Sequence, residues 1–117
     1  MKNIPDYRTM HRALWIGAVG LCLGAAPAWA GGDAAAGQKK AEACAACHGP
    51  AGAKPLTPDY PILAGQPEDY LSHTLKAYKS GKRKNAIMNG MAAPLSKQDI
   101  ADLAAYFSKQ PGLQVKY

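Results

Sequence analysis

The 117-residue sequence predicts an all-α domain, with three main helices joined by long loops. Three segments after residue 30 carry apolar side chains at the three- and four-residue spacing of amphipathic helices. No segment alternates apolar and polar residues convincingly, as a half-buried strand does. The connecting segments 49–66 and 81–95 are long for so small a domain, and such loops are usually wrapped around something. We therefore expect helices and loops that enclose a bound group.

The first predicted helix spans about Asp33 to Cys47. Its alanine-rich composition favours helix, and the Asp33 carboxylate can accept hydrogen bonds from the first free backbone N–H groups. The helix ends in the sequence Cys44-Ala45-Ala46-Cys47-His48. This is the C-x-x-C-H pattern of covalent c-type haem attachment.

The spacing of this motif has a chemical reason. Two thiols three residues apart on a helical turn can each form a thioether with one vinyl group of a single haem. The His48 imidazole is then held next to the iron and can bind it. A redox-active dithiol of the thioredoxin type would need a preceding strand, and a zinc site would need a second cluster of ligands. We therefore expect one covalently bound haem c, held by Cys44, Cys47 and His48.

The second predicted helix spans about Pro67 to Ser80. Pro67 suits a first helical position, acidic residues follow it at the positive end of the helix, and Gly81 can end the helix. The apolar stripe of this helix consists of Tyr70, Leu71, Thr74, Leu75 and Tyr78.

The third predicted helix spans about Ser96 to Gln110. Ser96 and Asp99 resemble a capping box with a shorter acid, and Pro111-Gly112 end the helix. Its buried stripe is expected to be Ile100, Leu103, Ala104 and Phe107.

A second axial ligand is expected, because electron-transfer haems pair histidine with methionine or with another histidine. His73 lies off the apolar stripe of its helix, which favours a surface position. Met88 and Met91 lie in the second loop, about forty residues after His48. Either methionine can serve as a soft ligand or pack against the haem, and spacing alone does not separate them.

Residues 1–30 have the pattern of a secretory signal peptide. An apolar run from 13 to 26 ends before Ala28-Trp29-Ala30, and basic residues precede it: Lys2, Arg8 and Arg12. We expect cleavage after Ala30, a periplasmic cytochrome domain over residues 31–117, and loss of Cys22 with the signal. The apolar run is shorter than the roughly 20 residues that span a bilayer, so no stable membrane insertion is expected after cleavage. An uncleaved anchor remains the alternative.

The formal net charge is +6. A basic surface suits steering toward acidic protein partners, and Lys54, Lys82 and Lys84 are candidates for orienting them. A role in solubility explains the same charges equally well. Nucleic-acid binding is not expected, because basic and aromatic residues are not interleaved.

The chain resembles the class I cytochromes c, most closely the small monohaem c553 type and one domain of the dihaem c4 type. The resemblance covers nearly all of residues 31–117, through the motif Cys44–Gly49 and the segments 32–39, 61–66, 87–96 and 99–107. It implies the class I cytochrome c fold, with three main helices and long loops wrapped around one covalently attached haem. It places the ligand methionine at Met88, seven residues before Leu95, and makes Met91 a packing residue.

The resemblance implies two further structural roles. Pro61 matches a proline whose carbonyl accepts a hydrogen bond from the haem-binding histidine. Tyr106 matches an aromatic residue of the last helix that packs across the first helix, where Gly37 permits close approach.

These observations predict a periplasmic monohaem cytochrome c, monomeric or weakly dimeric. It is expected to carry single electrons between respiratory or dehydrogenase partner proteins through a His/Met-ligated haem c, without catalytic residues. One alternative is an electron-entry subunit of a larger oxidoreductase complex. Another is a sensor or enzyme that binds a small ligand at a labile sixth position.

Overall fold

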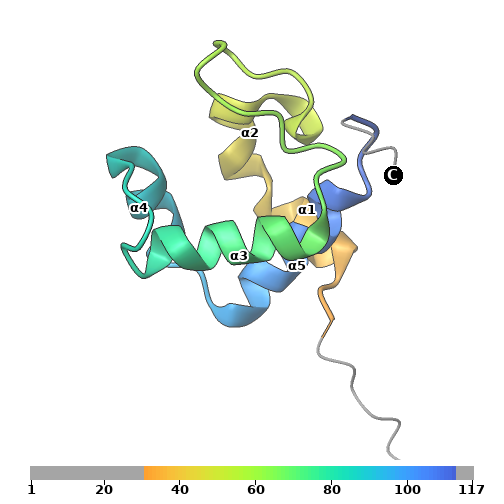
Figure 1. Ribbon diagram of the computed structural model, residues 1–117. Helices are drawn as coiled ribbons and strands as arrows, with labels where there is room; N and C mark the ends of the chain where they lie inside the picture. The colour runs from red at the N-terminus through yellow and green to blue at the C-terminus, as the bar shows by residue number, and fades with distance from the viewer. Residues whose placement is uncertain (1–30, 113–117) are drawn as a thin grey trace, which may run out of the picture.

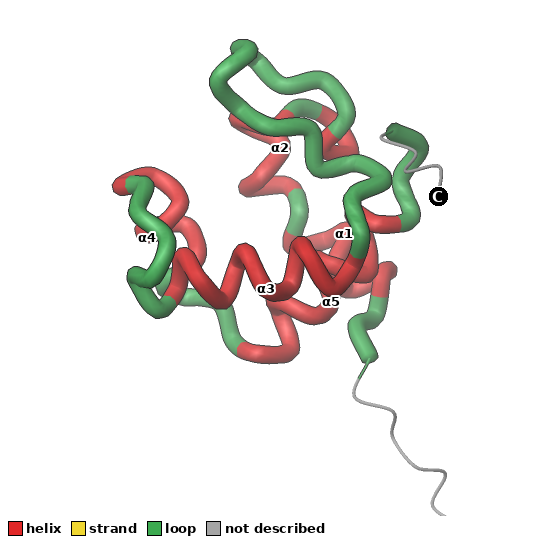
Figure 2. Tube along the Cα trace, in the orientation of Figure 1, coloured by secondary structure: helices red, strands yellow, loops and turns green. Residues whose placement is uncertain are grey.

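The computed structural model describes residues 31–112, and this part of the chain contains helices and loops without strands (Figure 2). Five α-helices and one short 3₁₀ helix follow in order: α1 Ala34–Lys40, α2 Glu42–His48, η2 Pro50–Gly52, α3 Glu68–Lys79, α4 Ala86–Ala92 and α5 Lys97–Ser108. The all-α prediction is confirmed. The predicted signal peptide, residues 1–30, lies outside the described residues. None of the described helices has the length and apolarity needed to cross a membrane.

The segment predicted as one helix from Asp33 to Cys47 is two helices, so this prediction was wrong in its boundaries. The Asp33 side chain caps α1 as expected, accepting hydrogen bonds from Ala35 and Ala36 N–H at 2.8 and 3.3 Å. The break lies at Ala41, which is buried in the core. The reason is tertiary, because α1 packs along α5 while α2 turns toward η2 and the loop that follows (Figure 1).

Gly37 lies where α1 crosses α5. A Cβ atom built on Gly37 would lie 2.0 Å from the Asp102 carbonyl oxygen and 2.8 Å from Tyr106 Cβ. Real atoms cannot approach this closely, so the crossing requires glycine. The expectation that Tyr106 packs across the first helix at Gly37 is confirmed.

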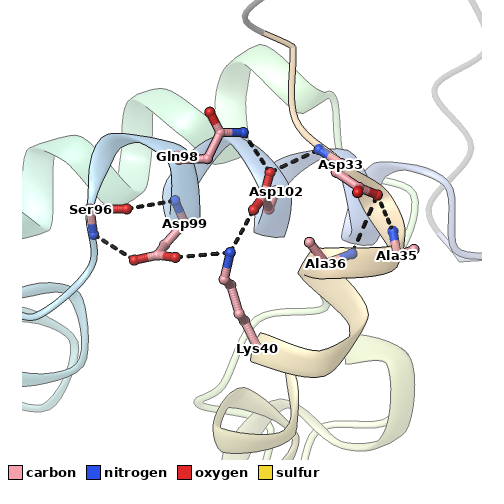
Figure 3. A network of polar contacts seen from close by, with 8 residues as sticks. All are labelled: Asp33, Ala35, Ala36, Lys40, Ser96, Gln98, Asp99 and Asp102. Atoms are coloured by element: carbon pink, nitrogen blue, oxygen red, sulfur yellow. Dashed lines mark hydrogen bonds and ion pairs between the residues drawn. The ribbon is translucent and has the colours of Figure 1, made fainter.

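A polar network stabilises the same crossing of α1 and α5 (Figure 3). The Asp102 carboxylate, buried at 2 % exposure, accepts hydrogen bonds from Asp33 N–H at 2.8 Å and from Gln98 Nε2 at 2.7 Å. Lys40 Nζ lies 2.5 Å from Asp102 Oδ2 and 2.9 Å from Asp99 Oδ1. The segment before α1, the end of α1 and the start of α5 are thereby joined through one lysine and two carboxylates.

This network predicts a loss of stability in acid. The hydrogen bond from Lys40 is the main cause that lowers the pKa of Asp99 to about 2 and holds the pKa of Asp102 below its ordinary value. Folded-state pKa values below those of the unfolded chain stabilise the fold fully above about pH 4, and the stabilisation is lost as pH falls through the folded values. We expect Lys40→Met to lower the melting temperature of the holoprotein at pH 7, and to reduce its dependence on pH between about 4 and 2.

Thermal unfolding across pH 2–7 measures this effect, with Lys39→Met as the matched control. Lys39 is exposed on the same helix and makes no ion pair within residues 31–112. Parallel pH curves for Lys40→Met and the unchanged protein would contradict the assigned role of the network.

The second and third predicted helices are confirmed as α3 and α5, with ends one or two residues shorter than expected. Pro67 is the N-cap of α3 rather than its first helical residue, and Gly81 follows the helix with a left-handed φ of 73°. Ser96 and Asp99 form both hydrogen bonds of the predicted capping box. The whole predicted stripe of α5 is buried, and the main core cluster consists of Ala41, Leu71, Leu103, Ala104 and Phe107.

Both segments predicted as irregular loops contain a short helix. η2 lies in the first segment, and the seven-residue α4 lies in the second. The Asn85 side chain caps α4 by accepting a hydrogen bond from Met88 N–H at 3.0 Å. Asn89 and Gly90 have low helix propensity, so α4 depends on its caps and on contacts with α3, which a propensity argument does not include.

Candidate functional site

The motif cysteines lie three residues apart on α2. Residues with this spacing face the same side of a helix, so the helix presents both thiols together. Cys44 and Cys47 are free thiols, and each is half-buried. This arrangement suits two bonds to one flat group lying beside α2.

Burial raises the pKa of the Cys44 thiol, and the nearby Cys47 thiol adds to the rise. Redox-active dithiols have the opposite property, because they need a lowered thiol pKa to form the attacking thiolate. The raised pKa of Cys44 therefore does not suit an activated thiol of a redox-active dithiol.

His48 ends α2 and is 6 % exposed. Its Nδ1 lies 2.8 Å from the carbonyl oxygen of Pro61. Because a carbonyl can only accept, this contact requires the proton on Nδ1 and leaves the Nε2 lone pair available for a metal. The hydrogen bond that the family resemblance implied is present.

The loop after α2 folds back so that Pro61 can reach His48. Gly49 has a φ of 78°, and a Cβ atom there would lie 1.8 Å from the Lys54 carbonyl oxygen. Leu56 N–H donates to the Cys47 carbonyl oxygen at 3.0 Å, and the ring of Tyr60 meets His48 edge-on with centroids 6.0 Å apart. The contacts that fix His48 thus come from a segment predicted only to be a loop.

The two candidate methionines lie one turn apart on α4. Met88 is half-buried, whereas Met91 is 40 % exposed. His73 is exposed on α3, as the sequence predicted. The structure brings the two cysteines and His48 together on α2. It places Met88 on a separate helix beside the end of α3 (Figure 1).

The donor set fits haem c. The chain provides paired thiols, one buried imidazole with a defined tautomer, and a thioether from another helix, which are the groups that attach and ligate such a haem. Residues 31–112 contain no group of three His, Cys, Asp or Glu side chains that could hold a metal ion by themselves.

Sequence reasoning missed two asparagines, the N-cap residue Asn85 and Asn89 within α4. Asparagine is a preferred N-cap residue, so Asn85 three residues before Met88 was a usable signal for the start of a helix. Asn89 has no comparable sequence signal, because its partners lie on α3 and on the loop after it.

Comparisons with known proteins show the family. The family model described as Cytochrome c matches residues 34–110. The cytochrome c-554(548) of Halomonas halodenitrificans is 52% identical over 82 residues, which cover 68% of this chain and 98% of that protein. The thiosulfate dehydrogenase electron acceptor of Thiomonas intermedia is 44% identical over 101 residues, 86% of this chain and 44% of that protein.

The crystal structure of reduced recombinant cytochrome c4 from Pseudomonas stutzeri superposes with a TM-score of 0.65 at 46% identity, covering 70% of this chain and 47% of that chain. The chain therefore spans nearly the whole of one relative and less than half of the other two proteins.

Proposed function

The chain belongs to the cytochrome c family, and from this premise we propose that Cys44 and Cys47 would hold its haem covalently while His48 and Met88 would bind the iron. The protein is a haem c electron-transfer protein and not an enzyme. The observation that carries the assignment of His48 is its buried ring, whose Nδ1 lies 2.8 Å from the Pro61 carbonyl oxygen.

Each residue has a defined part in this function. When bound, haem c supplies an iron that takes up and releases one electron. The Pro61 carbonyl holds the His48 ring in one orientation and makes Nε2 a stronger donor. The neutral Met88 thioether would favour the reduced iron and so raise the reduction potential. The protein thus supplies two fixed ligands and an apolar setting, with no acid–base step.

Single methionine substitutions test the sixth ligand. We expect the Met88→Ala holoprotein to bind carbon monoxide and to lose the methionine–iron charge-transfer band, because the sixth position is then open. Met91→Ala is the matched control, and we expect it to keep the band and to stay inert to carbon monoxide. Absorption spectra of the oxidised and reduced proteins, with and without carbon monoxide, measure both properties. The reverse result would transfer the ligand role to Met91.

We further propose that the protein works in the periplasm, after cleavage following Ala30, and that residues 31–117 form the functional domain. The signal-peptide pattern of residues 1–30 supports this proposal. The measurement is mass spectrometry of the haem-bearing protein from a periplasmic extract. A holoprotein that begins at Met1 and sediments with membranes would point to a retained anchor.

Redox proteins are its partners, and we propose that its electron donor is a dehydrogenase. The relative named thiosulfate dehydrogenase electron acceptor supports this choice. The candidate partner-orienting lysines Lys54, Lys82 and Lys84 are all exposed. Reduction of the purified holoprotein by a thiosulfate dehydrogenase, followed in the absorption of the haem, tests the proposal. If a thiosulfate dehydrogenase does not reduce the holoprotein but another dehydrogenase does, the donor is still a dehydrogenase, but one that acts on a different substrate.

A further inference from the structure

We infer that Asn89 is a positioning residue for the sixth haem ligand: it holds α4 against the end of α3 and so fixes Met88. The inference rests on the proposed ligand role of Met88. It adds a residue that is not one of the proposed haem-binding residues.

The Asn89 side chain connects three backbone segments. Its Nδ2 donates to the Tyr78 carbonyl oxygen at 2.7 Å and to the Arg83 carbonyl oxygen at 2.9 Å. Its Oδ1 accepts a hydrogen bond from Asn85 N–H at 3.0 Å. Both amide donors and the acceptor are therefore in use, and they tie α4 to the last turn of α3 and to the loop between the two helices.

Met88 is fixed by the same arrangement. It directly precedes Asn89, and its own N–H donates to Asn85 Oδ1 at 3.0 Å. Asn85 thus binds Met88 through its side chain and Asn89 through its N–H. The two asparagines are therefore hydrogen-bonded to each other at the first turn of α4. Through Asn85, the same contacts also hold the backbone N–H of Met88.

Few apolar side chains of α4 are buried against other parts of the chain. Ala92 is the only residue of this helix that is buried, and Ile87 is 56% exposed. A second polar contact lies just beyond the other end of the helix, where Lys79 Nζ donates to the Ala93 carbonyl oxygen at 2.6 Å. Hydrogen bonds from α3, the following loop and Asn89 therefore connect the helix that carries Met88 to the rest of the chain.

The test uses two Asn89 variants of the holoprotein. Asn89→Asp keeps an acceptor for Asn85 N–H but has no amide hydrogens to donate, and Asn89→Ala removes donors and acceptor. Losing two hydrogen bonds of ordinary net strength raises the population with a detached α4 roughly tenfold or more. We expect carbon monoxide to bind roughly tenfold faster to reduced Asn89→Asp than to the unchanged protein, and faster again to Asn89→Ala. Covalent haem content should remain unchanged.

Two reference variants separate positioning from general destabilisation. Ala105→Gly weakens α5 at its contact with the segment before α1, where Ala105 Cβ lies 2.9 Å from a Cβ built on Gly32. It should lower the melting temperature without accelerating carbon monoxide binding. Met88→Ala defines the rate of a fully open sixth position.

The outcomes distinguish the inference from the proposal on which it rests. Asn89 variants as inert as the unchanged protein, beside a reactive Met88→Ala, would overturn the positioning role and leave the ligand assignment intact. Carbon monoxide rates that follow melting temperature equally in Ala105→Gly and the Asn89 variants would also overturn it. An inert Met88→Ala would overturn the ligand assignment itself.

Discussion

The Cys44→Ala, Cys47→Ala double variant is expected to accumulate little protein and to carry no covalently bound haem. Each thioether needs one of these sulfurs, and α2 presents both from one turn. Loss of the haem should also lower the amount of folded protein, because Ile100 and Leu103 are the largest fully buried side chains among the described residues. A core this small is marginal without the apolar surface of the cofactor. Haem-dependent peroxidase staining after denaturing electrophoresis, beside an immunoblot for total chain, measures both effects.

The remaining cysteine provides a matched control. Cys22 lies in the predicted signal peptide, so Cys22→Ala should leave haem staining and yield unchanged. The single variants Cys44→Ala and Cys47→Ala should retain one thioether at reduced yield. Normal amounts of covalently haem-bearing protein from the double variant would show that these cysteines do not attach the haem.

The helices that sequence predicted best are those whose ends are determined locally. The start of α5 follows from the Ser96–Asp99 capping box, and the start of α3 follows from Pro67 and the acidic residues after it. These signals act within one turn of the helix that they bound, so no knowledge of distant contacts is needed. The buried stripe of α5 was predictable for a similar reason, because its apolar spacing matches the helical period.

The remaining elements depend on contacts between distant segments. The sequence from Asp33 to Cys47 favours one helix, and the break at Ala41 arises because α1 must follow α5 while α2 must meet the loop beyond it. Lys40 and Asp102 are 62 positions apart, and no local rule pairs them. α4 was missed because its asparagines and glycine weaken the helical signal, and Asn89 gains its partners only when α3 is in place.

The candidate site also has a part that local sequence predicts and a part that depends on contacts between distant segments. Cys44, Cys47 and His48 form a contiguous motif whose chemistry could be predicted from five residues. Pro61 was assigned by resemblance alone, and its hydrogen bond to His48 confirms that assignment. Met88 remains a prediction, because the ligand role depends on where a separate helix meets the haem.

Gly37→Ala is expected to destabilise the fold severely, although alanine favours a helix more than glycine. The propensity gain is about 1 kcal/mol. The new Cβ atom would lie 2.0 Å from the Asp102 carbonyl oxygen, and this backbone atom cannot move without separating α1 from α5. Separating the helices also strains the bonds from Lys40 to Asp102. We expect a net loss of about 2 kcal/mol or more, which lowers the melting temperature of the holoprotein by roughly 10 °C.

Gly90→Ala is the control that separates the effect of the close contact between α1 and α5 from the effect of the higher helix propensity of alanine. Gly90 also lies inside a helix, and a Cβ atom there would meet nothing within 4 Å. The same substitution should therefore stabilise α4 slightly, by up to about 1 kcal/mol, and leave the melting temperature unchanged or raised. Thermal unfolding followed by circular dichroism measures the melting temperatures of both variant holoproteins. Equal melting temperatures for the two variants would mean that α1 and α5 can separate at little cost, and that the crossing at Gly37 does not determine the stability of the domain.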